Sequence, residues 1–161
     1  KGIRILHIDA GHEYHEVFHS MLSFAPYVIN TGIIVMDDYN DPEFPGIEAA
    51  VLDFCEIDRP RRFVPFFSGA NKIYLCATHM AQIFQEVILS NENIKNSSRL
   101  TVVRDFAIIK GFSKIPTSYE KTMQNLSNFY KSEDVRFGTS NHYIENIKLK
   151  AKKYAQMMQD K

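Results

Sequence analysis

"IRILHIDAGHEYHEVFHSMLSFAP", Ile3 to Pro26, decides the expected fold, because its hydrophobic period changes within a few residues. The opening, Ile3 to Asp9, is short and rich in β-branched residues, and it ends in an aspartate beside Ala-Gly. This pattern predicts a buried strand that runs into a turn. Apolar residues then recur at helical spacing from Tyr14 to Ala25, and Pro26 ends the pattern. The stretch therefore predicts a strand, a turn and an amphipathic helix.

The same alternation continues along the first half of the chain. A second buried strand, Gly32 to Tyr39, also ends in carboxylates, and a second helix is expected over Ile47 to Ile57. Two strand-like runs, Arg62 to Phe67 and Lys72 to Ala77, flank the turn residues "SGAN" and predict an antiparallel hairpin. This order implies an α/β fold whose parallel strands have right-handed crossovers and are closed by an antiparallel strand.

Beyond residue 77 the signals are weaker. Helical spacing is present from Met80 to Leu89 and from Tyr119 to Tyr130, and an apolar stripe among lysines predicts an amphipathic helix from Asn141 onward. The run from Leu100 to Phe112 is interpreted as a further strand, bent at Arg104-Asp105. The second half is therefore expected to be mostly helical.

Composition excludes several classes of protein. A chain of 161 residues can bury a core without a disulfide or metal staple, and its 19 acidic and 19 basic residues give no net field toward nucleic acid or an anionic membrane. Cys55 and Cys76 lie outside any C-x-x-C arrangement, which favours buried, reduced thiols. No apolar run approaches the ~20 residues of a membrane span, and no signal peptide opens the chain. We therefore expect a cytoplasmic protein with no nucleic-acid or membrane partner.

His15-Glu16-Val17-Phe18-His19 matches the H-E-x-x-H pattern of zinc peptidases. Such a site needs both histidines facing a cleft and a third ligand from elsewhere. His15 and His19 flank the side of the helix away from its apolar face, and no second helix offers an obvious third ligand. A solvated, histidine-rich helix face is the favoured interpretation. A zinc hydrolase that uses His15, Glu16 and His19 is kept as an alternative function, ranked after the two that are given below.

Aspartates close both predicted parallel strands. Asp9 ends the first strand, and Asp37 and Asp38 end the second. Neighbouring parallel strands lie ~5 Å apart and open on the same edge, so the three carboxylates would converge and call for Mg²⁺, Mn²⁺ or Ca²⁺ rather than zinc. His12, just past the first strand, is the nearest candidate base. The same residues are equally consistent with a helix cap at Asp9 and a turn that starts at Asp37 and Asp38.

Three segments together resemble a known family: "LHIDAGHEYHEV" (Leu6 to Val17), "TGIIVMDDY" (Thr31 to Tyr39) and "PGIEAAV" (Pro45 to Val51). In this order they resemble the second half of class I S-adenosylmethionine-dependent methyltransferases. The resemblance is to the branch of metal-dependent O-methyltransferases that act on sugars and other natural products. In that branch the fourth strand usually ends in I-D-G-D or I-D-G-G-H, and the fifth reads G-G-x-x-x-x-D-D-Y. The resemblance covers roughly Ile3 to Cys76.

The resemblance implies a Rossmann-like sheet divided between two units. Residues 1–77 would form the C-terminal half of the methyltransferase domain, and residues 78–161 a mostly helical extension packed on it. The family's first half supplies a glycine-rich loop that holds S-adenosylmethionine, but none of the seven glycines here forms G-x-G, so no residue is assigned to the cofactor. We therefore expect either the C-terminal portion of a longer methyltransferase, which the start at Lys1 supports, or a truncated descendant.

Carried over by position, the resemblance implies that Asp9, Asp37 and Asp38 hold a divalent cation, Mg²⁺ or similar, at the methyl-transfer centre. Gly11 stands where relatives carry a second acidic residue, which leaves His12, with Asp9, as the catalytic pair. The expected function is transfer of a methyl group from S-adenosylmethionine to a hydroxyl of a small molecule or sugar. The alternative is a non-catalytic binding or assembly module, whose exposed sheet edge is covered by a partner chain or, in a homo-oligomer, by a second copy.

Overall fold

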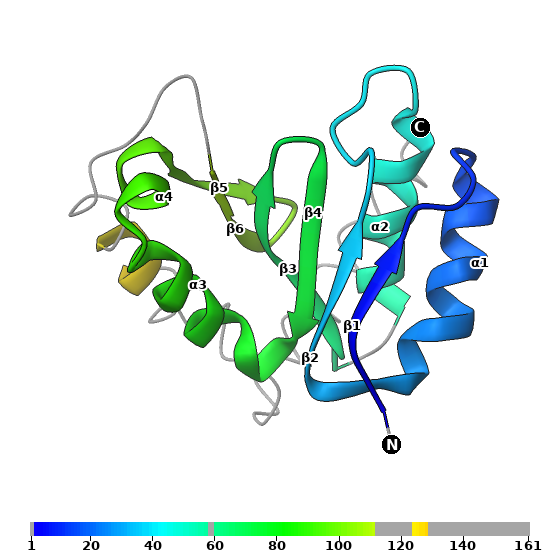
Figure 1. The fold of residues 1–161 in the computed structure, drawn as a ribbon, viewed down its shortest axis with the longest axis horizontal. Helices are drawn as coiled ribbons and strands as arrows, with labels where there is room; N and C mark the ends of the chain where they lie inside the picture. Colours follow the sequence, from blue (N-terminus) through cyan, green and yellow to red (C-terminus); the bar gives the residue numbers. More distant parts are fainter. Residues whose placement is uncertain (1, 58–59, 112–123, 129–161) are drawn as a thin grey trace, which may run out of the picture.

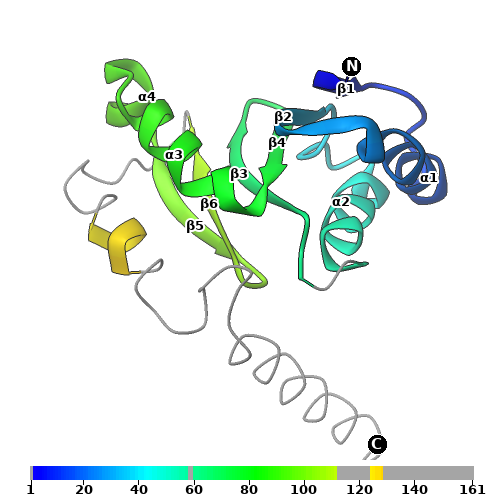
Figure 2. The same cartoon turned by 90° about the horizontal axis from the view of Figure 1, so that it is seen from below.

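The protein forms one six-stranded mixed sheet with helices on both faces (Figures 1 and 2). This architecture is seen in a computed structural model that describes residues 2–57, 60–111 and 124–128. The elements, in chain order, are β1 (Ile3–Ile8), α1 (Tyr14–Phe24), β2 (Val28–Met36), α2 (Pro45–Ile57), β3 (Phe63–Gly69), β4 (Lys72–Ala77), α3 (Ala81–Leu89), α4 (Glu92–Ser97), β5 (Arg99–Val103) and β6 (Phe106–Lys110).

The strand order is β1-β2-β4-β3-β6-β5. β1 and β2 are parallel, and β4 is inserted antiparallel between β2 and β3. β6 pairs parallel with β3, and β5 pairs antiparallel with β6. Hence β1, β2, β3 and β6 run in one direction, and β4 and β5 in the other. The expected α/β class is confirmed at this level, as are the parallel first pair and the β3–β4 hairpin.

The sheet does not end at residue 77. The described part of residues 78–161 contains the helices α3 and α4, but it also contains β5 and β6, which extend the same sheet through β3. The bend expected at Arg104-Asp105 is a two-residue hairpin turn, because Val103 pairs with Phe106 across it. A single apolar run thus supplies two strands, and the expectation of a mostly helical second half is wrong for these residues.

Two helices expected near the end of the chain fall largely or wholly outside the described residues. Within the expected helix from Tyr119 to Tyr130, residues 124–128 are described and helical. The expected helix from Asn141 onward lies outside the described residues.

A buried glutamine links the second half to the first. Gln85, on α3, is fully buried, and its Nε2 donates to the carbonyl oxygens of Phe66 on β3 (3.0 Å) and Ala107 on β6 (2.7 Å). The ladder between these two strands pairs only Phe67 with Ile109 and Ser68 with Lys110. The side-chain amide therefore bridges β3 and β6 next to a short ladder.

Helix α1 buries a narrower face than its spacing predicts. Val17 and Met21 are buried against the sheet, whereas Tyr14 and Leu22 keep 38% and 40% of their surface exposed.

Both cysteines, Cys55 and Cys76, are free and buried, as expected, and burial raises the pKa of each thiol. Within the described ranges, no helix combines the length and apolarity that crossing a membrane requires.

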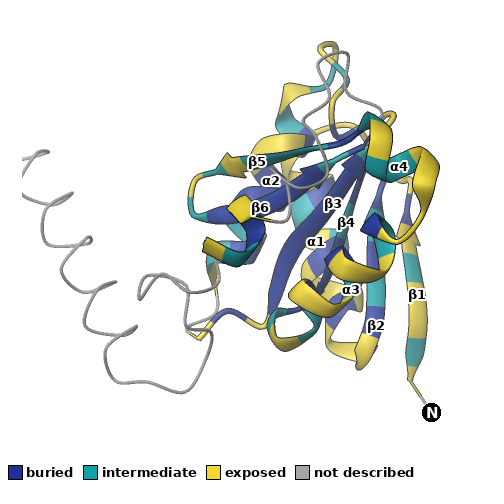
Figure 3. Cartoon of the chain, turned by 90° about the vertical axis from the view of Figure 1, so that its left-hand side faces the viewer, coloured by how far each residue is buried: buried dark blue, intermediate teal, exposed yellow. Residues whose placement is uncertain are grey.

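Strand β1 is unusually exposed for a parallel strand. It lies at the edge of the sheet, only Ile8 in it is buried, and Ile5 is 69% exposed (Figure 3). Parallel strands are normally covered on both faces. The outer edge and one face of β1 thus present apolar side chains and backbone groups to the surroundings.

Candidate metal centre

The carboxyl ends of β1 and β2 lie side by side. Ile8 and Met36, the last residues of the two strands, are register partners, and the backbone N–H of Asp37 donates to the carbonyl of Ile8 (3.1 Å). Asp9 therefore leaves β1 beside the point where Asp37 and Asp38 leave β2. This adjacency was expected from the sequence and is confirmed.

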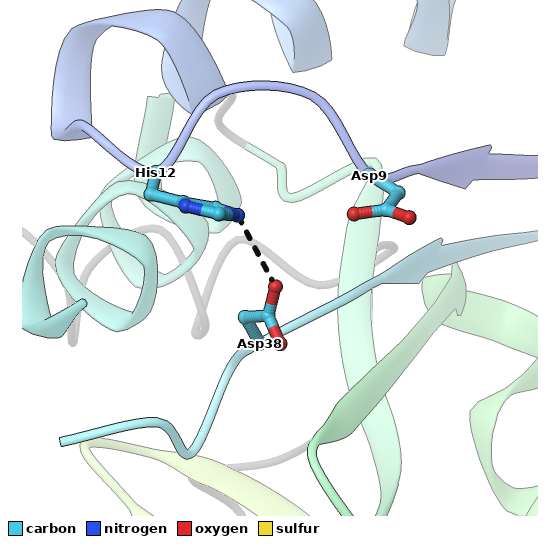
Figure 4. Close-up of side chains that lie close together, drawn as sticks. All are labelled: Asp9, His12 and Asp38. Atoms are coloured by element: carbon cyan, nitrogen blue, oxygen red, sulfur yellow. Dashed lines mark ion pairs between the residues drawn. The ribbon is translucent and has the colours of Figure 1, made fainter. Parts of the chain in front are cut away.

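Three side chains converge at this edge: Asp9, His12 and Asp38 (Figure 4). One ligand atom from each lies within 4.8 Å of the other two, and His12 Nε2 is 3.4 Å from Asp38 Oδ2. Asp9 and His12 belong to the loop between β1 and α1, and Asp38 to the loop between β2 and α2. Among the described residues, this is the one group of three histidine, cysteine or acidic side chains with such spacing. Its members line a shallow crevice at the strand ends.

Asp37 does not join this group. Its carboxylate pairs with the ammonium group of Lys72, the first residue of β4, and lies 3.4 Å from His7 Nε2 on β1. The Lys72 ammonium lowers the pKa of Asp37 below its ordinary value, and Asp37 in turn raises the pKa of Lys72. All three carboxylates line the same crevice, but only Asp9 and Asp38 lie, with His12, close enough together to share an ion, whereas Asp37 is paired with a cation.

Asp38 is held in an unusual conformation by the β3–β4 turn. Its φ of 52° lies in the left-handed region, which aspartate tolerates better than most residues. Asn71 Nδ2 donates to Asp38 Oδ1 (2.8 Å), and the backbone N–H of Tyr39 donates to the carbonyl of Asn71 (2.8 Å). Because Asn71 binds Oδ1, the other oxygen, Oδ2, is the one near His12. No pattern in the sequence marks Asn71 as a site residue, although it lies in the "SGAN" segment that predicts the turn.

His12 is placed by a tight turn that requires glycine. Gly11 has φ +65°, and a Cβ at this position would collide with the carboxylate of Glu16. Glu16 Oε2 accepts a weak hydrogen bond from the backbone N–H of Glu13 (3.4 Å), part of the capping box that begins α1. The His12 ring packs against the Phe44 ring in a tilted arrangement, with 4.0 Å between the ring centroids. Glycine therefore stands at this position, where the resembling family has an acid, for a local steric reason.

The H-E-x-x-H segment lies on the outer surface of α1. His15, Glu16 and His19 are all exposed, and Glu16 caps the helix. In the part of the chain that the structure describes, neither histidine belongs to a group of three spaced to hold a metal. This placement agrees with a solvated helix face.

Comparison with known proteins identifies no relative. No family model, no curated protein and no solved structure matches this chain.

Proposed function

We propose that this chain carries the metal-binding, acceptor side of an S-adenosylmethionine-dependent O-methyltransferase that acts on a hydroxyl of a small molecule or sugar. In this proposal Asp9 and Asp38 hold Mg²⁺ or a similar divalent cation, and His12 is the base. The observation that carries the proposal is the convergence of these three side chains at the ends of adjacent parallel strands.

The donor set suits a divalent cation. Asp9 and Asp38 supply carboxylate oxygens, which Mg²⁺ and Mn²⁺ prefer. Among the residues that the structure describes, no lysine or arginine forms an ion pair with either carboxylate. Lys72, which pairs with Asp37, interacts with Asp9 only at longer range, so the two neighbouring carboxylates still repel each other, and a bound cation would remove that repulsion. Because Asp9 is exposed, room remains for a substrate oxygen.

The side chains around this position suit the removal of a proton. A divalent cation bound by Asp9 and Asp38 would lower the pKa of an acceptor hydroxyl. His12 Nε2 would accept the hydroxyl proton, and Asp38 Oδ2, at 3.4 Å, would stabilise the charged ring. The Phe44 ring, packed against the imidazole, would keep it in place. No described residue is assigned to S-adenosylmethionine.

The strand arrangement supports a Rossmann-like interpretation of the first part of the chain. β1, β2 and β3 run in the same direction, and β4 returns antiparallel between β2 and β3. The resemblance implies parallel strands with a closing antiparallel hairpin, which is the pattern found here. The candidate site also lies at the carboxyl ends of parallel strands, where α/β sheets commonly bind ligands.

Manganese titration followed by electron paramagnetic resonance tests the metal site in the full chain. We expect the free Mn²⁺ signal to fall on addition of the protein, and Asp9→Asn and Asp38→Asn each to weaken binding at least about tenfold, because each loses a charged ligand. His15→Ala, which changes an exposed histidine outside the group, is the matched control and should bind normally. An absence of binding by Mn²⁺ and Mg²⁺ would overturn the proposal.

Methyl transfer is tested with methyl-labelled S-adenosylmethionine and a panel of hydroxylated acceptors. We expect label to be incorporated only when a divalent cation is present. His12→Ala should abolish incorporation while leaving Mn²⁺ bound, because His12 acts as a base. If Mn²⁺ binds but no acceptor is labelled, the methyltransferase assignment fails; if His12→Ala loses Mn²⁺, His12 is a ligand and the assigned role is wrong.

A second candidate function is protein assembly, and the exposure of β1 favours it. Ile5 is 69% exposed on β1, which pairs with β2 alone among the described strands, so its apolar surface and outer backbone edge could bind another chain. Sedimentation velocity of the wild type and of Ile5→Lys tests this function. A dimer that dissociates in Ile5→Lys supports assembly through β1, and a monomer at all concentrations excludes self-assembly.

A further inference from the structure

We infer that the β3–β4 turn decides which of two adjacent aspartates binds the cation. Asn71 orients the Asp38 carboxylate toward the site, and Lys72 keeps the Asp37 carboxylate out of it. This inference rests on the proposed metal site, and it assigns Asn71, in the turn, and Lys72, the first residue of β4, opposite effects on metal affinity.

The contacts of the two aspartates have the same layout but differ in charge. Each carboxylate lies 3.4 Å from one histidine Nε2 and is also bound by one residue of the β3–β4 hairpin, which is either in the turn or at the start of β4. For Asp37 that residue is the Lys72 ammonium; for Asp38 it is the neutral Asn71 amide, at 2.8 Å. An ammonium neutralises a carboxylate, whereas an amide donor fixes its orientation and leaves its charge for a cation.

Asn71 acts on one oxygen of Asp38. Its Nδ2 binds Oδ1, while Oδ2 stays within 3.4 Å of His12. Asn71 is thus assigned as a positioning residue that acts on the cation through Asp38. Partners of metal ligands in this position typically change metal affinity 10–100-fold when they are removed.

The turn is held against the Asp37–Asp38 loop in two further ways that do not involve the carboxylate of Asp38. The backbone carbonyl of Asn71 accepts from Tyr39 N–H, a bond that survives any change of the Asn71 side chain. Asn40 Nδ2 donates to Ser68 Oγ (3.1 Å) and to the carbonyl of Ala70 (3.3 Å). Asn40→Ala therefore provides a matched control, since it loosens the same two loops without touching Asp38.

The test is Mn²⁺ affinity, measured by electron paramagnetic resonance on the full chain. We expect Asn71→Ala to weaken binding about tenfold and to change the line shape of bound Mn²⁺. Asn71→Ser, which keeps a shorter donor, should restore part of the affinity. Asn40→Ala should leave affinity within about twofold, and the thermal midpoints of all three variants should stay close to one another, because the changed side chains lie near the protein surface.

The role of Lys72 is tested with a double-mutant cycle. Lys72→Met should tighten Mn²⁺ binding a few-fold, since it removes a cation from the neighbourhood. Asp37→Asn should change affinity only slightly in the wild type, but should weaken it clearly in the Lys72→Met background, where the Asp37 carboxylate is released.

The outcomes separate this inference from the proposed function. If the wild type binds no Mn²⁺, the metal site itself fails. If the wild type binds and Asp38→Asn does not, yet Asn71→Ala binds like the wild type, the metal site stands and the inference about Asn71 is overturned. Equal losses in Asn40→Ala and Asn71→Ala would also overturn it, because loop packing would then set the affinity. Additive effects of Lys72→Met and Asp37→Asn would overturn the role of Lys72.

Discussion

Asp37 and Asp38 are consecutive residues whose carboxylates have partners of different charge. Asp37 pairs with Lys72, a full cation that neutralises it, and its side chain is only 13% exposed. Asp38 has the neutral Asn71 amide and lies in one group with the carboxylate of Asp9. The difference teaches that two neighbouring carboxylates at one strand end can be bound by the same hairpin while only one of them is neutralised.

The largest expected effect is the loss of Mn²⁺ affinity when the Asp38 carboxylate is removed, compared with the loss when the Asp37 carboxylate is removed. Asp38→Asn should weaken Mn²⁺ binding about a hundredfold, at the upper end of the range seen for partners outside the ligand set, while Asp37→Asn should change it less than about fivefold. Isothermal titration at one pH and ionic strength measures both. Equal losses in the two variants would erase the distinction between the aspartates and would favour three converging carboxylates.

Gly11→Ala is expected to have the next largest effect, because it disturbs the turn that places His12 beside Asp38. The added Cβ must adopt φ +65° and displace the Glu16 carboxylate, so we expect a loss of about 2 kcal/mol in the free energy of unfolding. Urea denaturation measures this loss. Gly32→Ala is unsuitable as a control because its Cβ would also be crowded, by Val28. The control is therefore Ala49→Gly, at an exposed position of α2, which measures how the free energy of unfolding responds to an exchange of glycine and alanine elsewhere. A stability equal to that of the wild type in Gly11→Ala would mean that the turn relaxes freely.

The Asp37–Lys72 pair should contribute about 1 kcal/mol to the stability of the metal-free protein, as partly exposed pairs do. The folded pKa of Asp37 lies below its ordinary 3.8, so its contribution is present above that value and is lost as the pH falls through the folded pKa. The folded pKa of Lys72 lies above 10.5, so its contribution is present below 10.5 and is lost as the pH rises through the folded pKa.

Urea denaturation of Lys72→Met and the wild type across the pH range measures this contribution. The difference in unfolding free energy should be constant between about pH 5 and pH 9 and should shrink below pH 3.8. Lys95→Met, which breaks the exposed pair with Glu92 on α4, is the control and should show little difference at any pH. A difference that grows on acidification would contradict the assigned pair.

The adjacency of Asp9 and Asp38 could be predicted from the sequence, whereas the separation of Asp37 could not. A strand, a helix and a second strand place two carboxyl ends on one edge by topology alone. Which way each aspartate points depends on the φ of 52° at Asp38 and on Lys72, which a hairpin register brings to that edge. The second hairpin was missed because Arg104 and Asp105 interrupt an apolar run without a glycine or proline to mark the turn.

The smallest expected effect concerns the backbone of the turn that separates the two aspartates. Ala70 is the first residue of a two-residue hairpin loop and has φ 53°, a conformation that normally requires glycine. Ala70→Gly removes about 1 kcal/mol of strain but adds unfolded-state entropy, so we expect a net gain of about 0.5 kcal/mol, measured by urea denaturation. Arg104, with the same φ in the β5–β6 turn, pairs with Asp53, so Arg104→Gly should gain less. Because Ala70→Gly keeps Asn71 and Lys72, its Mn²⁺ affinity should equal that of the wild type; a loss would mean that strain at Ala70 helps to aim the turn at Asp38.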